Sequence, residues 1–80
     1  MAITRGQCRA ARALLEWTQD QLAETASVSK KTLADFEAGK RTPYDRTLAD
    51  IQRALEGAGI QFIPENGGGA GVRFSEPSRG

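Results

Sequence analysis

Residues 18–43 read TQDQLAETASVSKKTLADFEAGKRTP, and this stretch decides the fold. Thr18 is a favourable helix N-cap, and Gln21 stands three residues after it, which is the spacing of a capping box. The pattern predicts a short helix over about residues 19–25 that begins directly after Thr18.

A second short helix is predicted immediately downstream. Ser29 provides its N-cap, Gly39 suits the position just after its last turn, and the helix is expected over about residues 30–38. Leu33 and Phe36 recur at helical spacing and are expected to face inward. Two short helices joined by a tight turn meet at a steep angle, so the second can protrude and enter a DNA major groove.

The outward face of this second helix carries the chemistry of nucleic-acid recognition. The side chains that the core does not need are Lys30, Lys31, Thr32, Ala34 and Asp35. Lysine can donate to guanine O6 and N7, threonine can contact a base or a thymine methyl group, and aspartate can accept from cytosine N4. An acidic residue on a basic face favours selective reading of bases over general adhesion to phosphates.

Phosphate contacts are expected on both sides of that helix. Lys40 and Arg41 follow it in a loop, where they are placed for the DNA backbone. Thr18 and Ser29 leave free amides at the starts of their helices, and such amides bind phosphate. All three lysines fall between residues 30 and 40, although the net charge of the chain is only +1. A local basic cluster on a nearly neutral chain is typical of a protein that presents one face to phosphates.

Two further helices and a hairpin complete the expected fold. Helices are predicted over about residues 4–16 and 46–56, and strands over about residues 60–63 and 72–74. The predicted fold class is all-α: a compact four-helix domain followed by a short C-terminal β-hairpin extension.

The expected domain boundary follows Gly59 and separates a helical domain over residues 1–59 from a C-terminal hairpin and tail over residues 60–80. An isolated two-stranded hairpin is marginal in water, so a second copy of the chain is the expected supplier of a partner sheet. The predicted dimerisation residues are Ile60, Phe62, Ile63, Val72 and Phe74. The alternative is a chain that is disordered after Pro64, and residues 75–80 are expected to form a frayed end.

The motif in residues 18–43 resembles the Xre family of phage-repressor (Cro/C1-type) helix-turn-helix domains. The resemblance covers about residues 8–55, and its motif consists of Gln19, Leu22, Ala23, Val28, Ser29, Leu33, Glu37, Gly39, Lys40 and Pro43. It implies a lambda-repressor-like fold that binds double-stranded DNA and regulates transcription. It also implies that Gln19 bonds a backbone phosphate and that Arg12 forms a salt bridge with Glu37. The residues that it places at base edges are Lys30, Lys31 and Asp35.

One position departs from the family pattern. Ser27 stands where the tight turn between the two helices usually has glycine. A left-handed conformation there costs a non-glycine residue roughly 1 kcal/mol, so we expect the turn to form with slight strain.

These expectations combine into one predicted function. A homodimer reads a palindromic operator in duplex DNA through the major groove and acts as a repressor or autoregulator. The alternative is an interaction protein, such as an antitoxin or an antagonist of another regulator, whose C-terminal segment binds a foreign protein. Lysines at the start of the protruding helix favour DNA over this alternative.

Composition argues against other classes of protein. The sequence has no histidine, and its one cysteine, Cys8, has no base to activate it, so an enzyme is not expected. No ligand cluster suits a metal, and no cofactor or small-molecule ligand is expected. No apolar run approaches the roughly 20 residues that span a bilayer, and a single cysteine agrees with a reducing compartment. A cytoplasmic location without a membrane partner is therefore predicted.

Overall fold

The structure is a computed structural model that describes residues 2–76. Four helices come first: α1 (Arg5–Leu15), α2 (Gln19–Ala26), α3 (Lys30–Glu37) and α4 (Asp45–Gly57). Two antiparallel strands follow: β1 (Ile60–Ile63) and β2 (Gly71–Phe74). The predicted fold class is confirmed, and no element differs from its predicted bounds by more than one residue at either end. Within residues 2–76, no helix has the length and apolar character needed to cross a bilayer.

Side-chain caps set where the first three helices begin. Thr18 accepts a hydrogen bond from the backbone N–H of Gln21, and the Gln21 side chain accepts one from the Thr18 N–H, so the predicted capping box is present. A second box, which was not predicted, joins Thr4 and Gln7 at the start of α1. Ser29 caps α3 with its hydroxyl group. Each cap satisfies an amide that a helix N-terminus would otherwise leave unpaired.

Left-handed residues end the first two helices. Glu16 and Ser27 have φ of 58° and 59°, so the tight turn between α2 and α3 forms around a serine in the conformation that favours glycine. This conformation costs a non-glycine residue about 1 kcal/mol. Gly39, with φ of 77°, takes the same conformation just after α3 without that cost.

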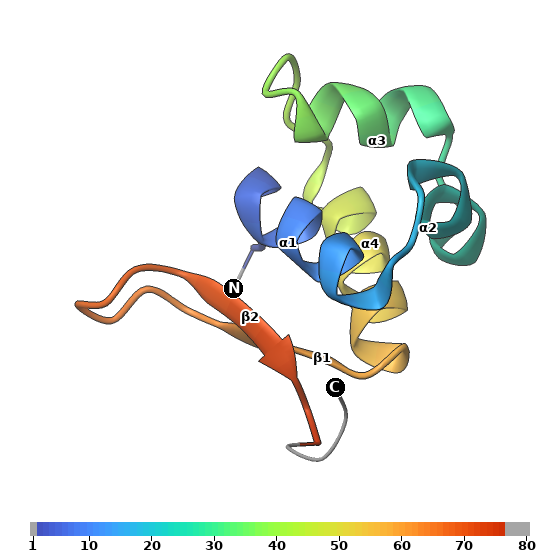
Figure 1. The fold of residues 1–80 in the computed structure, drawn as a ribbon. Coiled ribbons are helices and arrows are strands. Elements are labelled where there is room, and N and C mark those ends of the chain that lie inside the picture. The colour runs from blue at the N-terminus through green and yellow to red at the C-terminus, as the bar shows by residue number, and fades with distance from the viewer. Residues whose placement is uncertain (1, 77–80) are drawn as a thin grey trace.

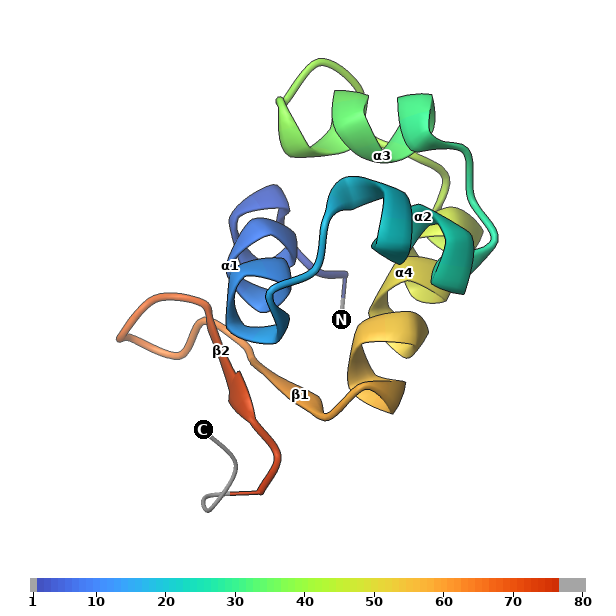
Figure 2. The ribbon, with the colours of Figure 1, turned by 45° about the vertical axis from the view of Figure 1, so that its right-hand side comes forward.

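The core lies where the helices and the hairpin meet. Its largest fully buried side chains are Leu22, Leu33, Ile51, Leu55, Ile60 and Cys8. Two views show α3 along one side of the fold and the hairpin along the opposite side, with α1 and α4 between them (Figures 1 and 2). The arrangement leaves the outer side of α3 uncovered by any other element that the structure describes.

The hairpin packs on the helices of its own chain. Ile60 pairs with Phe74 and Phe62 with Val72, and these four side chains share the inner face of the two-stranded sheet. Ile60 and Phe62 are buried in the core, while Val72 and Phe74 are half-buried against it. The helices of the same chain cover this inner face, so the hairpin does not depend on a second copy for it, and the contact with a second copy stays a prediction. The alternative of disorder after Pro64 does not hold over β2.

Gln7 fastens the hairpin to α1. Its buried side chain donates from Nε2 to the carbonyl oxygen of Ile63 at 3.2 Å and to that of Gly71 at 3.0 Å. Its Oε1 accepts from the backbone N–H of Thr4 at 2.9 Å. One glutamine therefore caps α1 and binds both strands of the hairpin.

The end of β2 is also fixed. Ser75 donates from its backbone N–H at 2.8 Å and from Oγ at 3.0 Å to the carbonyl oxygen of Gly59. The frayed end predicted over residues 75–80 therefore does not include Ser75, and residues 77–80 lie outside the described residues.

Candidate nucleic-acid interface

The turn between α2 and α3 directs one face of α3 away from the core. Leu33 and Phe36 point inward and are buried, and Ala23 on α2 is buried with them. Lys30 and Lys31 lie on the other face and expose 62% and 84% of their side chains. The lysines are thus free of any packing role, as the sequence predicted.

Each of these lysines is held by a carboxylate of the same chain. Lys30 Nζ lies 3.1 Å from Asp20 Oδ1, and Lys31 Nζ lies 3.1 Å from Asp35 Oδ2. Exposed pairs of this kind contribute about 0–1 kcal/mol, so phosphates or base edges can displace the carboxylates at small cost. Asp20 was not predicted at the site, and its only signal in the sequence is its position beside Gln19 at the start of α2.

The hydroxyl groups at the start of α3 are tied to each other. Ser29 Oγ accepts from the backbone N–H of Thr32 at 3.0 Å and donates to Thr32 Oγ1 at 2.8 Å. This arrangement uses the hydroxyl of Ser29 and leaves the hydroxyl proton of Thr32 for another acceptor. Of the two predicted DNA contacts, Thr32 therefore has the side chain better suited to bond a base.

Lys40 and Arg41 lie in the loop that leaves α3. Both are exposed, and their backbone N–H groups donate to the carbonyl oxygen of Asp35 at 2.8 Å and 3.4 Å. The loop therefore folds back over the end of α3 while its side chains stay accessible. Among residues 2–76, neither Lys40 nor Arg41 has a carboxylate at ion-pair distance.

Glu37, the last residue of α3, is the acceptor at the centre of a buried network. Arg12 Nη2 lies 2.7 Å from Glu37 Oε1, and Arg12 Nε donates to Oε2 at 2.9 Å, so the pair implied by the family resemblance is present and bidentate. Gln19 Nε2 donates to Oε1 at 2.9 Å, and Cys8 Sγ donates to Oε2 at 3.1 Å. Arg12 Nη1 donates further to the carbonyl oxygen of Trp17 at 2.9 Å. The network joins α1, α2 and α3.

The charges of this network are fixed by its hydrogen bonds. Burial by itself raises the pKa of Glu37, but hydrogen bonds from Arg12, Gln19 and Cys8 outweigh burial and hold that pKa below its ordinary value. The hydrogen bond to Glu37 raises the pKa of Arg12. Burial, followed by the hydrogen bond to Glu37, raises the pKa of the Cys8 thiol. Glu37 is therefore ionised at neutral pH, and Cys8 stays protonated as its donor.

Gln19 takes part in this network, although the resemblance assigned it to a phosphate. A glutamine amide has two N–H groups, and the bond to Glu37 uses only one of them. Gln19 is half-buried at the first position of α2, directly after the cap at Thr18. The bond to Glu37 orients the amide and leaves its second N–H available, and the phosphate contact stays a prediction.

Comparison with known families supports the assignment made from the motif. The helix-turn-helix family model matches residues 9–58, which is more than half of the chain and includes α2, α3 and α4 completely. The chain belongs to this helix-turn-helix family. The match confirms the resemblance to the Xre type, and this helix-turn-helix protein is a DNA-binding regulator. A comparison with curated proteins gave no match.

Proposed function

We propose that this helix-turn-helix protein binds a palindromic operator in duplex DNA as a homodimer and represses or autoregulates transcription. The observation that carries the proposal is the free face of α3, where Lys30, Lys31 and Thr32 are not needed by the core. A single helix fits the major groove, where each base pair presents its own pattern of donors and acceptors. Lysine can bind guanine, and threonine can contact a base or a thymine methyl group, so these side chains can distinguish base pairs.

The proposed contacts divide into those that read and those that position. Base edges meet Lys30, Lys31, Thr32 and Asp35, whose side chains occupy the outer face of α3. Phosphates meet the residues at the helix starts and in the following loop: Thr18, Gln19, Ser29, Lys40 and Arg41. Phosphate contacts set the register of the helix on the duplex without distinguishing sequences.

A homodimer provides a second copy of α3, which reads the other half of the operator. Two copies about one helical turn apart, roughly 34 Å, double the number of base pairs that are read. Ile60 and Phe62 are buried within their own chain, so the proposed subunit contact rests on the exposed parts of Ile63, Val72 and Phe74. Control by dimerisation and site occupancy needs no cofactor and suits the cytoplasmic location predicted from composition.

Selection of bound sequences from random duplex DNA tests the proposal. We expect enrichment of one motif with two inverted half-sites, centred about 10 base pairs apart, and binding that weakens steeply as salt rises. Sedimentation equilibrium should show a dimer whose population falls on dilution. Failure to retain any duplex, even at low salt, would refute the proposal and favour the protein-binding alternative.

A further inference from the structure

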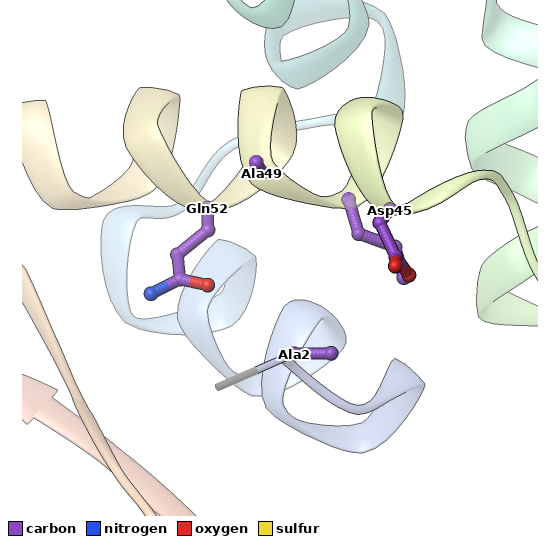
Figure 3. A pocket seen from close by; sticks show the side chains of 5 residues that line it. Ala2, Asp45, Ala49 and Gln52 are labelled. Atoms are coloured by element: carbon purple, nitrogen blue, oxygen red, sulfur yellow. The ribbon is translucent and has the colours of Figure 1, made fainter.

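Two hollows flank the short segment that precedes α1. One lies between this segment and α4 and is lined by Ala2, Asp45, Ala49 and Gln52 (Figure 3). Asp45 is the only charged side chain among its lining residues, so this hollow repels an anion. The other hollow, of about 360 Å³, lies between the same segment and the end of α3, and its lining carries the guanidinium of Arg5 instead of a carboxylate.

The Arg5 side chain reaches from the start of α1 to the end of α3. Its guanidinium lies directly against Gly39, where a Cβ atom would stand 2.7 Å from Nη1 and 2.9 Å from Cζ. Gly39 therefore serves two purposes, because its φ of 77° favours glycine and its missing side chain makes room for Arg5. The contact brings the charge of Arg5 beside the loop that holds Lys40 and Arg41.

The position of Arg5 in its own helix is electrostatically unfavourable. It is the first residue of α1, and the N-terminus of a helix favours acidic side chains, of which the first turn of α1 has none. The partial negative charge at the C-terminal end of α3 stabilises the guanidinium of Arg5. This interaction by itself would give Arg5 a structural role. That role does not account for the concentration of charge around it.

The cations near Gly39 are set apart by their gathering at one end of α3, since Arg9, Arg46 and Arg73 likewise have no carboxylate at ion-pair distance within residues 2–76. Within residues 2–76, the ion pairs neutralise Arg12, Lys30, Lys31 and Arg53. Arg5, Lys40 and Arg41 have no such partner among those residues, and the backbone brings them to one end of α3. Three neighbouring cations without a counterion repel one another and attract an anion.

We propose that Arg5 is a DNA phosphate contact that, with Lys40 and Arg41, binds the sugar-phosphate backbone at the C-terminal end of α3. This inference rests on the proposed DNA-binding function and extends its interface to the first residue of α1. Thr4 and Thr42 line the same hollow, and threonine hydroxyl groups can donate to a phosphate oxygen. Because phosphates carry no sequence information, Arg5 contributes to affinity equally on every duplex.

The test compares Arg5→Gln with wild type by fluorescence anisotropy on the selected operator and on an unrelated duplex. Arg5→Gln should weaken binding to both duplexes by a similar factor and lower the slope of log affinity against log salt by about 0.9. Raising the salt from about 50 to about 200 mM should then cost the variant roughly threefold to fourfold less affinity than it costs wild type. Arg53→Gln, which removes an exposed and paired cation from α4, is the matched control and should keep the wild-type slope.

Arg5→Lys separates the charge from the packing role. It should restore the salt slope even if its thermal unfolding temperature is as low as that of Arg5→Gln, because the cation remains. An unchanged salt slope in Arg5→Gln, or a reduced salt slope in Arg5→Lys, would overturn the inference. In either case, operator binding by wild type would leave the proposed function intact. If wild type binds no duplex, both fall together.

Discussion

Gln19 Nε2 donates a hydrogen bond to Glu37 Oε1 across 2.9 Å, which joins the first residue of α2 to the last residue of α3. The same carboxylate holds Arg12 of α1, so the residue that the family places at a phosphate is oriented by the network that orders the three helices. One buried carboxylate therefore holds both the angle between α2 and α3 and the orientation of the Gln19 amide.

Replacing that carboxylate should destabilise the fold. Glu37→Gln keeps the shape of the side chain but leaves the partly buried guanidinium of Arg12 without its counter-charge, and we expect a loss of about 3 kcal/mol in the free energy of unfolding. Urea denaturation followed by circular dichroism measures this loss. Glu24→Gln, on the exposed side of α2, is the control and should change the value by no more than about 0.5 kcal/mol. A loss under about 1 kcal/mol for Glu37→Gln would contradict the network's structural role.

The contribution of Glu37 should depend on pH in one direction. Its pKa is lower in the folded chain than its ordinary value of 4.5, so folding favours the ionised form. The stabilisation is then fully present above the unfolded pKa and is lost as the pH falls through the folded pKa. The difference in unfolding free energy between wild type and Glu37→Gln should shrink as the pH is lowered from about 6 towards about 3. A difference that stays constant or grows over this interval would show that the pKa is not lowered.

Relief of the strain at Ser27 should stabilise the protein. Ser27→Gly removes about 1 kcal/mol of strain at a left-handed serine but adds freedom to the unfolded chain, and the net gain should be up to about 0.6 kcal/mol. The opposite result is expected for Ser29→Ala, two residues on, since it removes the cap of α3 and should cost about 1 kcal/mol. Thermal unfolding of the two variants beside wild type distinguishes these outcomes. A melting temperature clearly below that of wild type for Ser27→Gly would mean that the turn is not strained.

Asp20 should restrain non-specific binding. Asp20→Asn frees Lys30 and removes a negative charge from the start of α2, where phosphates are proposed to lie. Affinity for an unrelated duplex should rise, and its salt slope should steepen by about 0.9, because on a duplex without the operator the freed Lys30 has no matching base edge and meets a phosphate. Asp50→Asn, which frees Arg53 on α4, makes the same change of charge away from α3 and should have no such effect. Equal responses of the two variants would mean that only net charge matters.

Substitutions of Lys31 and Lys40 should affect DNA binding in different ways. Lys31→Ala should cost about 1–3 kcal/mol on the preferred operator and relax the preference at one base position, because the lysine is proposed to read a base edge. Lys40→Ala should weaken binding about equally on all sequences, since it is proposed to meet a phosphate. Repeating the selection from random DNA with each variant compares the two. If both variants select the wild-type motif unchanged, Lys31 does not read a base.

The helices could be predicted because their signals are local. Thr18, Ser29 and Gly39 mark helix ends within a few residues of the positions that they affect, and the structure uses all three as expected. Leu33 and Phe36 likewise reveal the inner face of α3 through spacing alone. The family motif adds the pairing of Arg12 with Glu37, which is too distant in sequence for spacing to indicate.

The contacts between distant segments could not be predicted in the same way. Nothing near Gln7 in the sequence indicates that its amide binds Gly71, and nothing near Lys30 singles out Asp20 among the acidic residues as its partner. The alternating pattern of β1 indicates a buried face but does not indicate whether the same chain or a second copy buries it. Ile60 and Phe62 were therefore assigned to a subunit contact when the core of their own chain takes them.

The bond between Gln7 and Gly71 joins residues 64 positions apart and affects how the chain matures. Synthesis proceeds from the N-terminus, so the four helices emerge before the strands that cover their interior. Until both strands of the hairpin are made, the amide of Gln7 lacks one or both of its carbonyl partners, and the apolar surface that the hairpin later covers stays partly open to water. A nascent chain therefore completes this fold only after Gly71 has left the ribosome.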